Sequence, residues 1–480
     1  MPAINQEAYQ SPFSTRYGSR EMQALFSPAH RARLMRRMWL YLAEAQQELG
    51  LPITDQQIAQ LKAQAEHIDF SVIDGFEREL RHDVMAHLKA YAQAAPLAAP
   101  ILHLGATSCY VTDNADVLIL QDAMRLLRRR LLGTARALSR QALTYKALPM
   151  LGYTHFQPAQ PTTLGKRICL WLQDLLMDLR AVNDFLDNLR PLGCKGATGT
   201  QASFLALFEG DEGKVKALDI HIAKRMGFEA PLAVSGQTYT RKIDSLALAL
   251  LSGIAQSAGK FAGDMRLLQH LKEVEEPFEQ HQVGSSAMPY KRNPMRAERM
   301  AALARFVITG EANAAHTAAT QWLERSLDDS ANRRLALAEG FLAADAILTL
   351  YENIVSSLVV YPKMMEKNLL AELPFMATEN ILMKAVMKGG DRQELHERIR
   401  SHAMQAGKQV KEEGRPNDLL ARIAQDPAFG LSQAELDTLL QPMDYVGRAV
   451  SQTEEYITGE AAVLLAPFSG EEGLSAEISL

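Results

Sequence analysis

The fold class is decided by residues 243–268, IDSLALALLSGIAQSAGKFAGDMRLL. Apolar side chains recur there every three or four positions, at Ile243, Leu246, Leu250, Ile254, Ala258, Phe261, Met265 and Leu268. This spacing follows the 3.6-residue period of an α-helix and would place the apolar side chains in one stripe. The segment therefore predicts a helix of about seven turns.

Two more segments, residues 117–143 and 331–359, have the same periodicity and contain no proline. Runs of alternating β-branched residues, which would mark strands, are scarce in the whole chain. Helices of this length cannot bury an apolar stripe against themselves, so they must pack side by side. We expect an all-α protein with a central bundle of long helices.

Part of the first helix, LALALLSGIAQ at 246–256, is apolar around much of its circumference. Such a helix needs to be buried on more than one side. A homo-oligomer that shares the bundle among its subunits would supply this burial. An unusually large monomeric bundle is the alternative, and the residue pattern alone leaves both open.

Changes in composition along the chain suggest three helical domains. Residues 1–107 combine shorter helical segments with breaks marked by proline and glycine, and residues 108–361 hold the long helices. Residues 362–480 form shorter helical segments separated by KGGDRQ, EEGRPND and DPAFG. These three ranges are the expected domains.

Composition also excludes several classes of function. A net charge of −5 argues against nucleic acid as a partner, because proteins that bind the phosphate backbone are usually basic. No apolar run approaches the roughly 18 residues of a membrane helix. The three cysteines cannot all pair with one another, and the N-terminus lacks the features of a signal peptide. We expect a soluble cytoplasmic protein that binds neither nucleic acid nor membrane.

No sequence pattern indicates a metal or a nucleotide cofactor. Neither an HExxH motif nor paired cysteines occur, and GCKGATGT at 193–200 lacks the Gly-Lys-Ser/Thr ending of a phosphate-binding loop. We therefore expect no metal site and no cofactor.

Three polar segments interrupt the helical pattern. In the first, HLGATSCYVTDNAD at 103–116, Thr107 and Ser108 precede a helix, where hydroxyls and free backbone N–H groups can bind an anion. The simpler interpretation is that Ser108, Thr112 or Asp113 caps the helix. Both interpretations stay open, with capping the more ordinary one.

The other two segments contain groups that can move protons. LGYTHFQPAQPTTLGKR at 151–167 predicts a loop that contains His155, and a histidine titrates near neutral pH. VGSSAMPYKRNPMRAERM at 283–300 predicts a loop ahead of a helix that begins after Pro294, with Glu298 on the first stretch of that helix. Taken singly, a structural histidine and an ordinary surface loop explain these segments equally well.

Together, the three segments resemble the three conserved regions of the fumarase/aspartase superfamily of lyases, and GSSAMPYKRNP matches its signature. Further stretches resemble the adenylosuccinate lyase family, in the longer type also found in animals. They are RYGSREM (16–22), LRHDVMAHL (80–88), KGATGTQASF (195–204), SGQTYTRKID (235–244), ERSLDDSANRR (324–334) and GGDRQELHERIR (389–400). The resemblance therefore extends over nearly the whole chain.

The resemblance implies a reaction and an assembly. The reaction is a β-elimination that releases fumarate from two substrates of purine biosynthesis. Adenylosuccinate gives AMP, and the succinylated imidazole carboxamide ribotide (SAICAR) gives AICAR. The implied assembly is a homotetramer whose subunits share the central bundle, with each active site built from three subunits. The nearest rival is a lyase of the same superfamily with a non-phosphorylated substrate, such as argininosuccinate lyase. A structural oligomer that keeps only the fold is the second rival.

The resemblance also implies roles for individual residues. Ser285 would be the general base, with Ser286 as the alternative, and His155 the general acid, paired with Glu298. Lys291 and Asn293 would bind the carboxylate on which charge accumulates. His82 would be a second histidine in contact with the substrate.

A pocket for the substrate monophosphate is implied as well. Its residues would be Arg16, Tyr17, Arg325, Ser330 and Arg334. The remaining implied substrate contacts are Arg81, Asp83, Thr107, Ser108, Gln237 and Arg299. For each arginine, a surface ion pair is the ordinary alternative.

Overall fold

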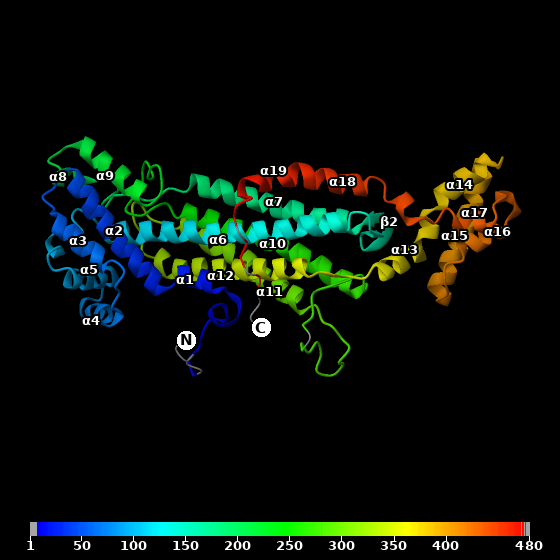
Figure 1. Cartoon of the computed structure of the whole chain (residues 1–480), viewed down its shortest axis with the longest axis horizontal. Helices are drawn as coiled ribbons and strands as arrows, with labels where there is room; N and C mark the ends of the chain where they lie inside the picture. The colour runs from blue at the N-terminus through cyan, green and yellow to red at the C-terminus, as the bar shows by residue number, and fades with distance from the viewer. Residues whose placement is uncertain (1–6, 280, 472, 475, 477–480) are drawn as a thin grey trace.

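A computed structural model describes residues 7–279, 281–471, 473, 474 and 476 of the chain. In this part of the chain, regular structure is almost entirely helical, and five long helices lie side by side in an elongated molecule (Figure 1). They are α6 (Ser108–Thr144), α7 (Leu164–Asn188), α10 (Lys242–His270), α11 (Met295–Ala319) and α12 (Asp329–Ser356). The expected all-α fold with a central long-helix bundle is confirmed.

Helix α10 corresponds closely to the helix predicted at 243–268, and it packs against α7, α11 and α12. Ile254, Phe261 and Met265 of the predicted stripe are fully buried. Leu246, at the edge of the stripe, is 49% exposed, whereas the neighbouring Leu251 is buried. The buried face is therefore turned slightly from the predicted stripe, and one apolar edge stays uncovered within a single chain.

Two predictions about local structure are wrong. The helix expected at 331–359 ends at Ser356, and β4 (Val359–Val360) pairs instead with β3 (Val274–Glu275). The loop expected at 151–167 is largely an antiparallel hairpin of β1 (Pro149–Thr154) and β2 (Gln157–Thr163). Each strand has a free outer edge in a two-stranded sheet, so the prolines of β2 cost no ladder hydrogen bond.

The N-terminal region packs around a second apolar cluster that includes Trp39 and Tyr91. Its elements before the bundle are η1 (Phe13–Tyr17), α1 (Arg20–Leu25), α2 (Pro28–Glu48), α3 (Asp55–Gln64), α4 (Phe70–Leu80), α5 (Asp83–Ala94) and η2 (Ala99–Ile101). Two later helices, α8 (Ala202–Leu207) and α9 (Glu212–Arg225), contribute Phe204 and Leu218 to the same cluster. This core therefore joins residues on both sides of position 107.

The C-terminal region has a third apolar cluster, formed around Ile381, Leu395 and Phe429. Its helices are α13 (Pro362–Met376), α14 (Thr378–Met387), α15 (Arg392–Glu413), α16 (Leu419–Gln425), η3 (Pro427–Phe429), α17 (Gln433–Asp437) and η4 (Pro442–Tyr445). The last helices run back along the bundle beside α7 (Figure 1). They are α18 (Ala449–Tyr456), η5 (Ile457–Ala461), α19 (Ala462–Leu465) and η6 (Ala466–Phe468). The expected domain limits at 107 and 361 stay predictions, and their outermost residues, 1–6 and 477–480, lie outside the described part.

No helix in the described part of the chain has both the length and the apolar character needed to cross a membrane. Charged side chains such as Asp244, Lys260 and Asp345 interrupt the long helices α10 and α12. Their apolar residues are instead used in packing one helix of the bundle against another.

The direction of the long helices gives the bundle two distinct ends (Figure 1). We call the end where α6, α10 and α12 begin the proximal end, and the end that carries the β1–β2 hairpin the distal end. Helix α6 has 37 residues and therefore separates the two ends by about 55 Å, at 1.5 Å per residue. Residues just before α6 and residues just after it thus lie far apart in one chain.

Candidate active site

At the proximal end, the first turns of α6 and α12 have no side-chain cap. Thr107 and Asp328 occupy the N-cap positions, and neither accepts a capping hydrogen bond. The hydroxyl of Thr112 donates instead to the Ser108 carbonyl oxygen (3.2 Å), and Asp113 binds an arginine. The capping expected from Ser108, Thr112 or Asp113 is therefore wrong. In these first turns the Tyr110 N–H donates to the Thr107 carbonyl oxygen (2.9 Å), and the Ser330 N–H donates to the Leu327 carbonyl oxygen (3.1 Å).

Arg241 joins these two first turns. Its Nη1 lies 2.9 Å from Oδ2 of Asp113 on α6, and its Nε lies 2.6 Å from Oδ2 of Asp329 on α12. All three side chains are at most 3% exposed. A buried guanidinium with both neighbouring carboxylates in place fixes the relative position of the two helix ends.

A second arginine, with its side chain 11% exposed, continues this network. Arg333 of α12 lies 2.6 Å from Asp244 on α10 and 3.2 Å from Asp116 on α6. Burial by itself would raise the pKa of Asp116, but Arg31 and Arg333 lower it below its ordinary value. Asp116 is therefore ionised at neutral pH and helps to hold the three helices together.

Several predicted substrate-binding residues meet on this network. The backbone N–H of Gln237 donates to the Glu324 carbonyl oxygen (3.0 Å). The side-chain oxygen Oε1 of Gln237 accepts a hydrogen bond from Sγ of Cys109 (3.5 Å), the residue next to Ser108. Arg325 binds Asp329 at 3.0 Å, close to Ser330 in the first turn of α12. The structure therefore brings Thr107, Ser108, Gln237, Arg325 and Ser330 together at the proximal end.

The RHD segment joins the same group. Nη2 of Arg334 lies 3.2 Å from Oδ2 of Asp83, the first residue of α5. His82 is the N-cap of α5 and accepts a hydrogen bond from the Met85 N–H through Nδ1 (3.3 Å). Arg81 ends α4 in the left-handed conformation, with φ at 53°, which turns the chain sharply toward α5.

The superfamily signature, GSSAMPYKRNP at 284–294, lies in a long loop between β3 and α11, which we call the signature loop. It is visible in Figure 1 as the green loop below the bundle. The Ser285 hydroxyl accepts a hydrogen bond from the Met288 N–H (3.2 Å), and Asn293 donates to the Gly284 carbonyl oxygen (2.8 Å). Ser286 and Lys291 are exposed. The side chains of Ser285 and Asn293 thus hold the loop conformation, while the side chain of Lys291 is exposed to solvent.

Helix α11 begins directly after this loop and carries two predicted site residues. Glu298 lies in its first turn, as expected, and is exposed. The guanidinium of Arg299 lies 5.5 Å from the ring centre of Tyr17 in η1, where Arg16 is exposed. The RYGSREM segment is therefore brought to the start of α11 and not to the proximal end.

His155 lies at the distal end, in the two-residue turn of the β1–β2 hairpin. His155 and Phe156 both have positive φ, 54° and 56°, as a type I′ turn requires. This conformation usually selects asparagine or glycine, and other residues that adopt it cluster at functional sites. His155 is exposed, and no hydrogen bond or ion pair joins it to Glu298 within the described residues of one chain.

The predicted site residues thus form three separate groups. The first group is at the proximal end, the second consists of the signature loop with Tyr17 and Arg299, and the third is the hairpin with His155. With these positions established, comparison with known proteins identifies the family. Residues 30–309 match the family model described as Lyase, and residues 374–456 match the model described as Adenylosuccinate lyase C-terminus.

Relatives named adenylosuccinate lyase match almost the whole chain. The protein of Schizosaccharomyces pombe is 51% identical over 464 residues, which cover 96% of each chain. The chain belongs to the adenylosuccinate lyase family. The Saccharomyces cerevisiae member is 50% identical over 463 residues and is also covered to 96%.

Solved structures outside the adenylosuccinate lyase family share its fold. A 3-carboxy-cis,cis-muconate lactonizing enzyme from Pseudomonas putida superposes with a TM-score of 0.81 at 26% identity, over 95% of this chain and 99% of that one. A fumarate lyase from Mesorhizobium sp. BNC1 gives 0.78 at 23% identity, over 94% and 100%. The long-helix bundle is therefore not a property of the adenylosuccinate lyases alone.

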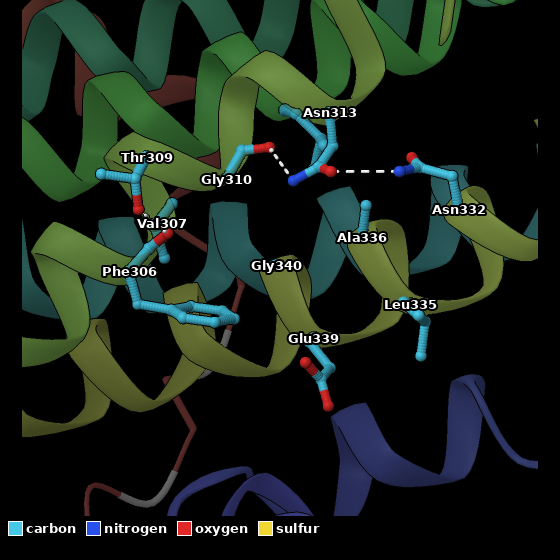
Figure 2. A pocket seen from close by; sticks show the side chains of 11 residues that line it. Phe306, Val307, Thr309, Gly310, Asn313, Asn332, Leu335, Ala336, Glu339 and Gly340 are labelled. Atoms are coloured by element: carbon cyan, nitrogen blue, oxygen red, sulfur yellow. Dashed lines mark hydrogen bonds between the residues drawn. The ribbon is translucent and has the colours of Figure 1, made fainter. Parts of the chain in front are cut away.

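A cavity of about 280 Å³ in this member of the adenylosuccinate lyase family is shown in Figure 2. It lies between α11 and α12, where Asn332 donates to Asn313 (3.0 Å), and Phe306 and Glu339 line another part. None of the predicted site residues lines this cavity. This cavity therefore does not hold the predicted site residues.

The sequence reasoning did not single out the residues that support the site. Arg241 lies in SGQTYTRKID, and Asp329 and Arg333 lie in ERSLDDSANRR, two of the stretches that carry the family resemblance. Only the structure shows that these side chains are largely buried and paired. The available signal was charge inside apolar helical segments, because a charged side chain facing a core must be paired.

Proposed function

We propose that this chain catalyses the elimination of fumarate from adenylosuccinate, giving AMP, and from SAICAR, giving AICAR. Membership of the adenylosuccinate lyase family, at about half identity to two fungal members, supports this reaction. We also propose the cytoplasm as its location, in keeping with three buried free thiols.

The reaction needs a base, an acid and a stabiliser for negative charge. We assign the base to Ser285, the acid to His155, and the binding of the charged carboxylate to Lys291 and Asn293. An isolated serine hydroxyl is too weak a base, so it needs help from a nearby cation and from the exclusion of water. Lys291, six residues away on the same loop, can turn toward the substrate, since it is exposed and, among the described residues, its one hydrogen bond is from its backbone N–H to the Met288 carbonyl oxygen.

We assign the phosphate to the proximal end. Arg325 and Arg334 supply guanidinium groups there, and Ser330 supplies a hydroxyl in the first turn of α12. The N-termini of α6 and α12, which have no side-chain cap, add the positive ends of two helix dipoles. Such a cluster suits a monophosphate, which a substrate such as argininosuccinate lacks.

The observation that carries the proposal is the distance between the groups. About 55 Å of helix separates Thr107 and Ser108 from His155 in one chain, far more than a substrate can bridge. A complete site therefore needs a second or third copy with its bundle running the other way. The exposed apolar edge of α10 at Leu246 provides a surface for such packing. We propose a homotetramer with active sites shared between subunits.

An absorbance assay tests the reaction directly. Turnover of adenylosuccinate and SAICAR is expected, whereas turnover of argininosuccinate alone would replace the proposed substrates. Failure to turn over any of the three would leave a structural oligomer as the better description.

Mixing two impaired variants tests the sharing of sites. His155→Ala and Arg334→Ala damage opposite ends of the bundle, so chains unfolded and reassembled together should regain turnover at substrate concentrations too low for either variant alone. Mixing Arg325→Ala with Arg334→Ala is the matched control, because both residues belong to the proximal end. No recovery in the first mixture would contradict the shared site.

A further inference from the structure

The two ends of the signature loop are tied together by a buried carboxylate. Oε1 of Glu276 accepts a hydrogen bond from the Arg296 N–H (2.9 Å), and Oε2 accepts one from the Ala297 N–H (3.0 Å). Pro294, at the N-cap position of α11, provides no side-chain cap. Glu276 is 3% exposed and thus caps a helix that begins on the far side of the loop.

The side chain of Arg296 extends the same connection. Its Nη2 lies 2.8 Å from Oε1 of Glu279, inside the loop, and its Nη1 donates to Oδ1 of Asn353 on α12. The guanidinium is 3% exposed. One buried arginine therefore links the loop, the start of α11 and the end of α12.

Asn353 is held on its other side as well. Its Nδ2 donates to the carbonyl oxygen of Ala476, 123 positions further along the chain (3.0 Å). The asparagine side chain is thus fixed between the C-terminal segment and Arg296. Its orientation determines where the Arg296 guanidinium can lie.

Other side-chain contacts between the loop and its surroundings are more exposed. Gln269 donates to the Arg292 carbonyl oxygen (2.9 Å), and Arg292 lies 3.3 Å from Glu275, with its own side chain 49% exposed. Exposed ion pairs contribute little to the stability of a conformation, whereas buried charged contacts hold a fixed geometry. Glu279 is itself 66% exposed, so the main restraint on the loop ends is the buried Glu276 carboxylate on the Arg296 and Ala297 N–H groups, together with the Arg296–Asn353 contact.

We propose that Glu276, Arg296 and Asn353 form a clamp that positions the loop carrying Ser285 and Lys291. These three are positioning residues, since they act on the substrate only through the loop. The inference rests on the proposed function in one respect, the assignment of the reacting groups to this loop. A misplacement of about 1 Å caused by a distant change can cost roughly 100-fold in rate.

Two substitutions at Asn353 test the clamp in the full-length enzyme. Asn353→Leu removes both hydrogen bonds, whereas Asn353→Asp keeps an acceptor for Arg296 and loses only the donor to Ala476. Amide hydrogen exchange of residues 283–292 should become faster in Asn353→Leu and stay near wild type in Asn353→Asp. The kcat of Asn353→Leu should fall about 10- to 100-fold with KM nearly unchanged, and Asn353→Asp should retain most of the activity.

Glu276→Gln provides a second variant in case Asn353→Leu folds poorly. It keeps the size of the side chain but leaves only one oxygen for two N–H groups. Amide exchange in the loop should therefore become faster and kcat should fall, as in Asn353→Leu. Asn368→Leu is the matched control. Asn368 is a similarly half-buried asparagine, and its bonds go to Leu271 and Glu273, outside the clamp.

The exchange measurement separates failure of the clamp from failure of the proposed function. Unchanged loop exchange in both Asn353→Leu and Glu276→Gln would overturn the clamp, whatever the activity. An equal loss of kcat and of loop protection in Asn353→Asp would assign the effect to the Ala476 contact. That result would also overturn the clamp. Faster exchange in a protein whose wild type turns over no substrate would support the clamp and reject the proposed function.

Discussion

The carboxylate of Asp83 and the guanidinium of Arg334 lie 3.2 Å apart, although 251 positions separate them in the chain. Both side chains are well exposed, so their ion pair can contribute only about 0–1 kcal/mol to stability. An exposed pair with so little structural value costs little to open, as the proposed phosphate site requires. The neighbouring Arg333 is buried and paired with two carboxylates, which makes it structural.

Arg334→Ala should therefore impair substrate binding far more than folding. Loss of a charged hydrogen bond of about 1.5–3 kcal/mol predicts a rise in KM of roughly 10- to 100-fold for the phosphorylated substrates. The melting temperature should change little. Arg125→Ala, which removes an exposed pair with Asp122 on α6, is the control and should leave KM unchanged. Equal KM values in the two variants would remove the phosphate role.

Arg241→Ala should have the opposite effect. It would leave the buried carboxylate of Asp113 without its bonded guanidinium and Asp329 with only Arg325, and breaking a buried pair costs about 3–5 kcal/mol. The variant should melt at a clearly lower temperature by calorimetry, in the presence or absence of substrate. Arg241→Lys should rescue only part of the loss, because an ammonium cannot reproduce the two-sided geometry of the guanidinium.

Ser285→Ala should abolish most turnover, with kcat lower by roughly 10²–10⁴, the usual contribution of a well-placed acid or base. Ser286→Ala should be much milder, and both variants should assemble normally in size-exclusion chromatography. The Ser285 hydroxyl is already bonded into the loop through Met288, whereas Ser286 is exposed. The reverse order of the two effects would assign the base to Ser286.

Asp178 of α7 should make stability depend on pH. Burial, opposed by a 2.7 Å hydrogen bond from Ser257 on α10, raises the pKa of Asp178 to about 7. In the unfolded chain this carboxyl loses its proton near pH 4, so between pH 4 and 7 the folded state binds more protons. Stability therefore falls as pH rises through this window and levels off above pH 7.

Asp178→Asn removes this dependence on pH. At pH 8 it should raise the melting temperature relative to wild type, with a gain of up to about 4 kcal/mol at 1.36 kcal/mol per pKa unit. At pH 4 the two proteins should unfold alike. Parallel melting curves of the two proteins from pH 4 to 8 would contradict the assignment to Asp178.

Periodicity predicted the long helices well, because their burial repeats every turn. Helix α10 was expected at 243–268 and runs from Lys242 to His270. The same signal did not separate the core face from the uncovered edge at Leu246, because this helix is apolar on both. The hairpin around His155 was missed, because its strands are short and rich in proline and show no clear alternation.

The chemistry of the candidate site was less accessible from sequence than its location. Motifs indicated Arg325, Ser330 and Arg334, and the structure brings these together with Gln237 and Ser108. Which charged groups are buried partners, such as Arg241 with Asp329, depends on contacts between distant segments that no local pattern encodes. The pairing of His155 with Glu298 stays a prediction.

At the left-handed turn of His155 and Phe156, selection for stability conflicts with selection for the proposed acid. A left-handed residue other than glycine or asparagine costs roughly 1–2 kcal/mol, so a library screened only for heat resistance should drift toward Asn-Gly at these two positions. That drift would delete the imidazole on which the proposed acid step depends. Substitutions that raise the melting temperature of this enzyme should therefore be selected at other positions, with His155 kept unchanged.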